Sequence, residues 1–229
     1  MKRLLAFTLA ETLVVMGIIG VVAALTIPNL NQSTGNREKV AKVKKIYSNL
    51  SDVYGRATAV YGPLDEWLTN IDNNDSDALT SKVRERMVDF MKISKTCDAD
   101  DNSCFKINHG CKSYILADGT SIVFEVKEKF LGGIENDGCG YILVDIDGPN
   151  KGKQKEGYDI FSFVLTKDGL MPSGETNPLN CFSETWGINS LCTAWVIQND
   201  NMDYLLADAK TGKCLNSDVT LSLTETSCK

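Results

Sequence analysis

Oxygen-bearing side chains gather in one short stretch of the sequence. Asp145 and Asp147 are separated by a single residue, Asn150 follows Gly-Pro, and Asp159 lies nine positions further on. Carboxylate and amide oxygens at alternate positions are ligands that Ca²⁺ prefers. The glycine stands in the fourth place rather than the sixth of an EF-hand loop, so that motif is not matched. The stretch predicts either a calcium loop or an ordinary turn, because Asp, Gly, Pro and Asn also favour turns.

The eight cysteines are the second group that could do chemistry. They are Cys97, Cys104, Cys111, Cys139, Cys181, Cys192, Cys214 and Cys228. No Cys-x-x-Cys pair is present, although zinc sites usually contain one. Disulfides in an oxidising compartment are therefore the favoured interpretation. Because eight cysteines allow 105 pairings, their number alone selects none of them.

No pattern typical of an enzyme is present. The single histidine, His109, has no triad pattern around it, and Ser162 lies in no nucleophile-elbow motif. The sequence also lacks a glycine-rich phosphate-binding loop. We therefore expect no catalytic site, and no cofactor unless calcium binds.

Glu11 stands alone in an apolar stretch. It is the only charged residue in the 21 residues from Phe7 to Ile27. A helix of this length is roughly 32 Å long, enough to cross the hydrocarbon core of a bilayer. A carboxylate in such a span costs about 2–3 kcal/mol or more, so it is usually functional and paired. Three alternatives are a secretory signal peptide with a small-residue site at Val22-Ala23-Ala24, a plain anchor helix, and a processed assembly helix.

The residues around Glu11 favour the assembly helix. A basic leader with Lys2 and Arg3 ends in the small residue Ala6, Phe7 follows, and Glu11 stands four residues later. In this segment the chain resembles the type IV pilins and type II secretion pseudopilins, most of which have glycine where this chain has Ala6. The resemblance implies cleavage by a prepilin peptidase between Ala6 and Phe7 and methylation of the new Phe7 amino group.

The resemblance also implies how the helix assembles. The Phe7 amine is mostly cationic at neutral pH, so Glu11 can neutralise it within a subunit or between staggered subunits. Pro28 has no N–H and is expected to kink or loosen the helix, which in the family continues past this proline. In many pilins a C-terminal disulfide closes a loop, which here implies a bond between Cys214 and Cys228. Apart from the resemblance, a bond between Cys181 and Cys192 would close another loop.

An amphipathic pattern follows the apolar stretch. The apolar stripe consists of Val40, Val43, Tyr47, Leu50, Tyr54 and Ala57, at alternating spacings of three and four. This spacing predicts one long helix from Phe7 to about Val60, ended by Gly62-Pro63. The basic run from Arg37 to Lys45 predicts a solvated helix face. Its alternative role is contact with anionic lipid headgroups before assembly or with acidic faces of neighbouring subunits afterwards.

Shorter elements follow this helix. A second helix is expected from Asp77 to Met91, and strands are expected over Ser113–Leu116, Thr120–Val126, Tyr141–Ile146 and Asp159–Leu165. Asp118-Gly119 marks a hairpin turn. The predicted fold is therefore α+β, with a long N-terminal helix packed on an antiparallel sheet, a membrane-spanning first half of that helix and a disulfide-rich C-terminal region.

Charge and length complete the prediction. The formal net charge is −6, which argues against general nucleic-acid binding. We expect a leader at 1–6, a transmembrane and assembly helix at 7–30, its amphipathic continuation at 31–62 and an extracytoplasmic α+β domain at 63–229. Lys2 and Arg3 predict that the leader lies inside the cytoplasm and the domain outside.

The resemblance implies a structural subunit of a type IV pilus or a type II secretion pseudopilus. Such a subunit starts as a single-pass precursor in the inner membrane, in contact with membrane lipid, and ends in a periplasmic or extracellular filament. Its partners would be prepilin peptidase, other pilin or pseudopilin subunits and an inner-membrane assembly platform. The alternative function is that of a minor or tip pilin that binds surfaces, glycans or DNA.

Overall fold

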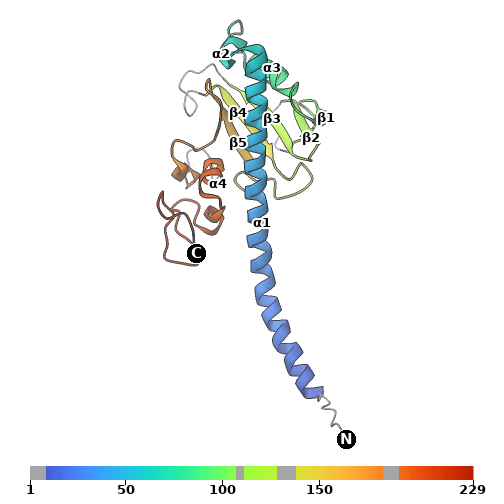
Figure 1. The fold of residues 1–229 in the computed structure, drawn as a ribbon, viewed down its shortest axis with the longest axis vertical. Helices are drawn as coiled ribbons and strands as arrows, with labels where there is room; N and C mark the ends of the chain where they lie inside the picture. Colours follow the sequence, from blue (N-terminus) through green and yellow to red (C-terminus); the bar gives the residue numbers. More distant parts are fainter. Residues whose placement is uncertain (1–8, 107–110, 128–137, 183–190, 229) are drawn as a thin grey trace. The chain divides into compact units, whose positions relative to one another are not determined.

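The structure is a computed structural model that describes residues 9–106, 111–127, 138–182 and 191–228 (Figure 1). Within helix α1 the side chains of residues 25–33 also lie outside the description. The chain divides into two compact units, Met1–Glu38 and Lys39–Lys229. Both contain part of α1, whose bounds are Leu9–Tyr61. Pro28 therefore lies inside a helix that continues beyond it, while Ala6, Phe7 and His109 fall outside the described residues.

The second unit holds an antiparallel sheet whose six strands are adjacent in chain order. They are β1 (Ile93–Cys97), β2 (Ser113–Leu116), β3 (Ser121–Val126), β4 (Gly140–Asp145), β5 (Ile160–Leu165) and β6 (Leu170–Pro172). The predicted hairpin joins β2 to β3, where Gly119 adopts a φ of +90°. There the N–H of Leu116 donates to the carbonyl of Thr120 at 2.8 Å. The α+β class and the antiparallel sheet agree with the sequence prediction.

Short helices complete this unit. Among the described residues they are α2 (Leu64–Trp67), α3 (Ser76–Val88), α4 (Thr193–Asn199) and two 3₁₀ turns, η2 (Pro178–Phe182) and η3 (Asp203–Leu206). The side chain of Asp75 caps α3 by accepting a hydrogen bond from the N–H of Ala78 at 2.9 Å. Such an N-cap stabilises a helix by about 1 kcal/mol. Leu79, Val83 and Met87 then bury one face of α3.

The two faces of the sheet pack against different residues. Phe124, Ile142 and Phe163 belong to the main core, together with the apolar stripe of α1 and the buried face of α3. The ring of Tyr47 stacks on that of Phe163 with centroids 5.7 Å apart. On the opposite face, Val123, Leu143 and Ile160 at the intervening strand positions form a smaller core together with Phe105, which lies between β1 and β2. This alternation follows from the two-residue period of a strand.

The prediction of a membrane-spanning first half of α1 is corrected by the structure. Among the described residues, no helix combines the length and the apolar character that crossing a membrane requires.

Apolar side chains of the first unit are exposed in the single chain. Leu9, Leu13, Val14, Val15, Met16, Ile18, Ile19, Val21 and Val22 each expose more than half of their surface. Successive residues of a helix point about 100° apart, so these side chains surround the helix axis. This part of α1 thus presents an apolar surface on every side, and Glu11 is its only charged residue.

Candidate functional site

The loop between β4 and β5 holds the carboxylates that were predicted to bind calcium. Asp145 is fully buried at the end of β4. Its Oδ1 accepts hydrogen bonds from the N–H groups of Asp147 at 3.1 Å and Gly148 at 3.0 Å. Its Oδ2 accepts one from Nε2 of Gln154 at 2.8 Å. Burial raises the pKa of Asp145, against the effect of these hydrogen bonds.

Asp159 closes the other end of this loop. It is fully buried, and its carboxylate accepts hydrogen bonds from the backbone N–H groups of Lys153, Gln154 at 2.9 Å and Lys155 at 2.6 Å. To present its N–H there, Gln154 adopts a φ of +53°, which is uncommon for a residue other than glycine. The two buried aspartates therefore fix the backbone of the loop through N–H donors.

The four predicted calcium ligands have different surroundings. Asp145 and Asp159 are brought to the same loop, whereas Asp147 pairs with Lys42 and Asn150 is exposed. Within the described ranges, no group of three or more His, Cys, Asp and Glu side chains is arranged to hold a metal ion. Nε2 of Gln154 also lies 2.7 Å from the carbonyl oxygen of Lys151, among oxygens that a cation would use. Calcium binding by these residues stays a prediction.

The basic run of α1 makes ion pairs within the chain. Lys42 Nζ lies 2.8 Å from Asp147 Oδ1, Lys45 Nζ lies 3.3 Å from Asp118 Oδ2, and Lys44 Nζ lies 2.7 Å from Asp200 Oδ1. Lys39 donates to the carbonyl of Tyr158 at 3.0 Å, and its ammonium lies 3.3 Å from the centre of the Tyr158 ring. The side chains of Lys42, Lys44 and Lys45 stay 41%, 41% and 64% exposed, as expected of a solvated face. These lysines also connect α1 to the β2–β3 turn, the β4–β5 loop and the end of α4.

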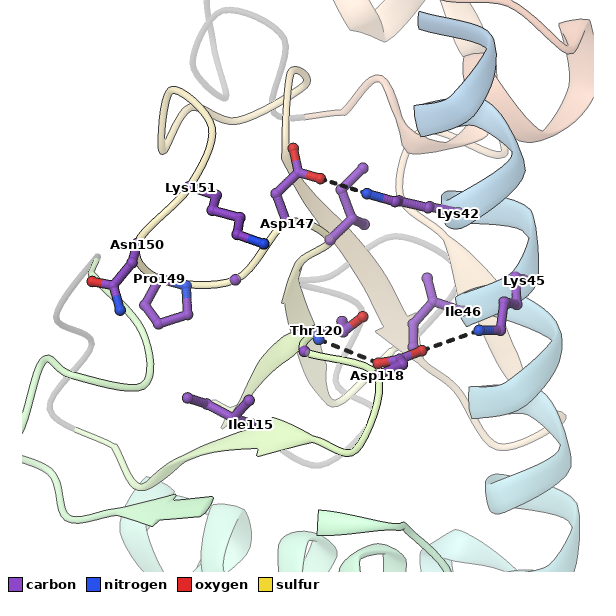
Figure 2. Close-up of a pocket in the computed structure, with 13 residues that line it drawn as sticks. Lys42, Lys45, Ile46, Ile115, Asp118, Thr120, Asp147, Pro149, Asn150 and Lys151 are labelled. Carbon is purple, nitrogen blue, oxygen red and sulfur yellow. Dashed lines mark hydrogen bonds and ion pairs between the residues drawn. The ribbon is translucent and has the colours of Figure 1, made fainter. Parts of the chain in front are cut away.

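A pocket lies between α1 and two of these loops (Figure 2). Lys42, Lys45 and Ile46 line it from α1. The β2–β3 turn contributes Asp118, Gly119 and Thr120, and the β4–β5 loop contributes the segment 146–151. Its volume is about 370 Å³, and Ile115 of β2 adds an apolar side chain to its wall. The pocket therefore combines ammonium groups, carboxylates and apolar surface.

Six of the eight candidate cysteines form disulfides. The bonds join Cys97 to Cys104, Cys181 to Cys192 and Cys214 to Cys228. For Cys111 and Cys139 the prediction is wrong, since both are free thiols. Cys139 belongs to the main core, whereas Cys111 packs on the smaller core across the sheet, so the sheet separates the two thiols. Burial raises the pKa of Cys139 to about 12.

Sequence reasoning missed several residues of this region. Lys39 and Lys42 were treated as part of a charge run, and Gln154 and Tyr158 were not considered. No pattern in the sequence marks Gln154, because its positive φ and the acceptors around its side-chain amide are features of the folded loop. Lys42 and Asp147 are 105 residues apart, so no local pattern pairs them.

Comparisons with known proteins found no relative of this chain. No protein-family model, no curated protein and no solved structure matches this chain.

Proposed function

We propose that this chain is a structural subunit of a type IV pilus or a type II secretion pseudopilus, assembled through its N-terminal helix. The observation that carries the proposal is the apolar surface on all sides of α1 between Leu9 and Val22. A helix that is apolar all round requires burial on every side, because exposed apolar surface is unfavourable in water. Packing among copies of the same helix provides that burial.

Glu11 gives this assembly a register. It lies in the first turn of α1, on a part of the helix that is otherwise apolar. In the proposed filament its carboxylate pairs with the amine of the processed Phe7 of a neighbouring subunit. An uncompensated charge in an apolar core is strongly unfavourable, so only a stagger that brings the two charges together is stable.

The second unit would form the outer part of the filament. Three disulfides in this unit are typical of a protein that folds in an oxidising compartment. The proposal therefore places the mature chain outside the cytoplasm, after cleavage between Ala6 and Phe7 by prepilin peptidase. Its remaining partners would be further subunits and an assembly platform.

Two measurements, one on the native chain and one on a variant, test the proposal. Intact mass and N-terminal sequencing should find a chain that begins at a methylated Phe7. Glu11→Gln should abolish or deform filaments seen by electron microscopy while leaving that processing intact. Glu38→Gln, at an exposed carboxylate further along α1, is the matched control and should leave filaments unchanged. A start near Leu25, or normal filaments from Glu11→Gln, would refute the proposal.

A further inference from the structure

Among the described residues, the pocket beside α1 contains one ammonium group that has no carboxylate partner. Lys151 belongs to the β4–β5 loop and lines the pocket, and among the described residues no carboxylate oxygen lies within 4.0 Å of its Nζ. Figure 2 shows Lys151 and Asp147 reaching in from this loop and Lys42 and Lys45 from α1. Lys151 can therefore take an anionic group without breaking an existing ion pair.

A second ammonium group is only weakly held. The side chains of Lys45 and Asp118 are 64% and 38% exposed, and their charges are 3.3 Å apart. Exposed pairs of this kind contribute about 0–1 kcal/mol, so a ligand can replace Asp118 as the partner of Lys45 at little cost. Lys45 and Lys151 are thus two ammonium groups of the pocket that can each bind an anionic group of a ligand.

The pocket also contains groups that would reject a simple anion. Asp118 and Asp147 both line it, and each repels a ligand that is negative throughout. Carboxylates accept hydrogen bonds, so both aspartates instead favour a ligand that carries hydroxyl donors. Ile46, Ile115 and Ile146 supply apolar surface for the C–H groups of a ring.

We propose that this pocket binds a sugar acid, a ring that carries one carboxylate and several hydroxyl groups. Lys151 binds the carboxylate, Asp118 and Asp147 accept hydrogen bonds from the hydroxyl groups, and the isoleucines contact the ring. A volume of about 370 Å³ lies within the range of small-ligand pockets and suits a monosaccharide. Such recognition goes beyond filament assembly and would give the subunit a binding function for acidic glycans.

Titration of the full-length chain with D-glucuronate tests this proposal. Binding is followed by calorimetry, with D-glucose and inorganic phosphate as comparison probes. Glucuronate should bind saturably and at least about tenfold more tightly than either probe, because glucose lacks the carboxylate and phosphate lacks the ring with its array of hydroxyl donors. Equal affinity for phosphate and glucuronate would overturn the proposal in favour of a plain anion site, and the absence of saturable binding would overturn it outright.

Matched variants locate the binding site. Lys151→Ala should weaken glucuronate binding about tenfold, since a hydrogen bond to a charged group is lost. Lys155→Ala removes an exposed lysine of the same loop that does not line the pocket, and should have no effect. Equal losses in both variants would refute the assignment. Glu11→Gln should bind glucuronate normally even where it forms no filament, so a failure of either proposal can be told from a failure of the other.

Discussion

Lys42 Nζ lies 2.8 Å from Asp147 Oδ1 and joins the middle of α1 to the loop that follows β4. Asp147 is the more buried partner, with 17% of its side chain exposed, and Lys39 Nζ lies 4.0 Å from its other oxygen. Two ammonium groups of one helix therefore share a single carboxylate. The sharing places a favourable charge interaction between elements that are far apart in the sequence.

Asp147→Asn should lower the free energy of unfolding by about 0.5–1 kcal/mol, because it removes the charge that both lysines share. The loss should shrink at high salt, where the pair is screened. Urea unfolding at low and high ionic strength measures both effects. Asp118→Asn, at a longer and more exposed pair, is the control and should cost less. An equal cost for the two substitutions would contradict this account.

Alkaline pH should destabilise the second unit through Tyr54. Burial raises the pKa of Tyr54 to about 12, and its hydroxyl donates to the carbonyls of Thr166 at 3.0 Å and Lys167 at 3.1 Å. An unfolded tyrosine ionises near pH 10, so the folded state holds this proton more tightly. Stability from Tyr54 is therefore fully present below about pH 10 and is lost as pH rises towards about 12.

Urea unfolding at pH near 9 and near 11 measures this loss. Tyr54→Phe should reduce the fall in stability between the two pH values, and should cost about 1 kcal/mol at neutral pH from the lost hydrogen bonds. Cys139, which also keeps its proton to about pH 12, leaves part of the fall in place. A pH dependence unchanged by Tyr54→Phe would show that Tyr54 is not responsible.

Local patterns in the sequence predicted the elements that carry strong periodicity. The stripe from Val40 to Ala57 is buried or half-buried because a helix brings residues three and four apart to one face. The Asp118-Gly119 turn was predictable because glycine readily adopts the positive φ that the turn needs. By contrast β1 was missed, since three of its five residues are exposed and no apolar alternation marks it.

The candidate site was less predictable than the fold. Asp145 and Asp159 were found because acidic residues in one loop are visible in the sequence. Their actual partners are backbone N–H groups and the Gln154 side-chain amide, whose positions depend on the conformation of the whole loop. The pairing of Lys42 with Asp147 depends on how α1 packs against the sheet, which no local pattern contains.

The disulfide between Cys214 and Cys228 should contribute substantially to stability. It joins cysteines separated by 14 positions in the sequence, and the chain-entropy estimate for a loop of this size is about 3 kcal/mol. Replacing both cysteines by serine should lower the free energy of unfolding by roughly this amount, as measured by urea denaturation. Cys111→Ser alters a half-buried thiol outside any disulfide and should cost less. A larger effect from Cys111→Ser would contradict the assigned bonds.

Thr80 of α3 should be among the most sensitive polar residues of the core. Its hydroxyl accepts a hydrogen bond from the N–H of Val126 at 2.9 Å and donates one to the carbonyl of the same residue at 3.2 Å. The β2–β3 ladder ends where Ser113 pairs with Val123, so Val126 lies beyond it. The threonine side chain thus takes the place of a neighbouring strand at the end of β3.

Thr80→Val keeps the shape of the side chain but removes both hydrogen bonds. It should lower the free energy of unfolding by about 2–4 kcal/mol, because two buried backbone groups lose their partners at about 1–3 kcal/mol each. Thr69→Val is the matched control, since the Thr69 hydroxyl donates to the carbonyl of Asp65 at an exposed position. Urea unfolding compares the two variants, and hydrogen exchange at Val126 reports the local effect. If Thr80→Val unfolds no more easily than Thr69→Val, water rather than Thr80 completes the hydrogen bonding of β3.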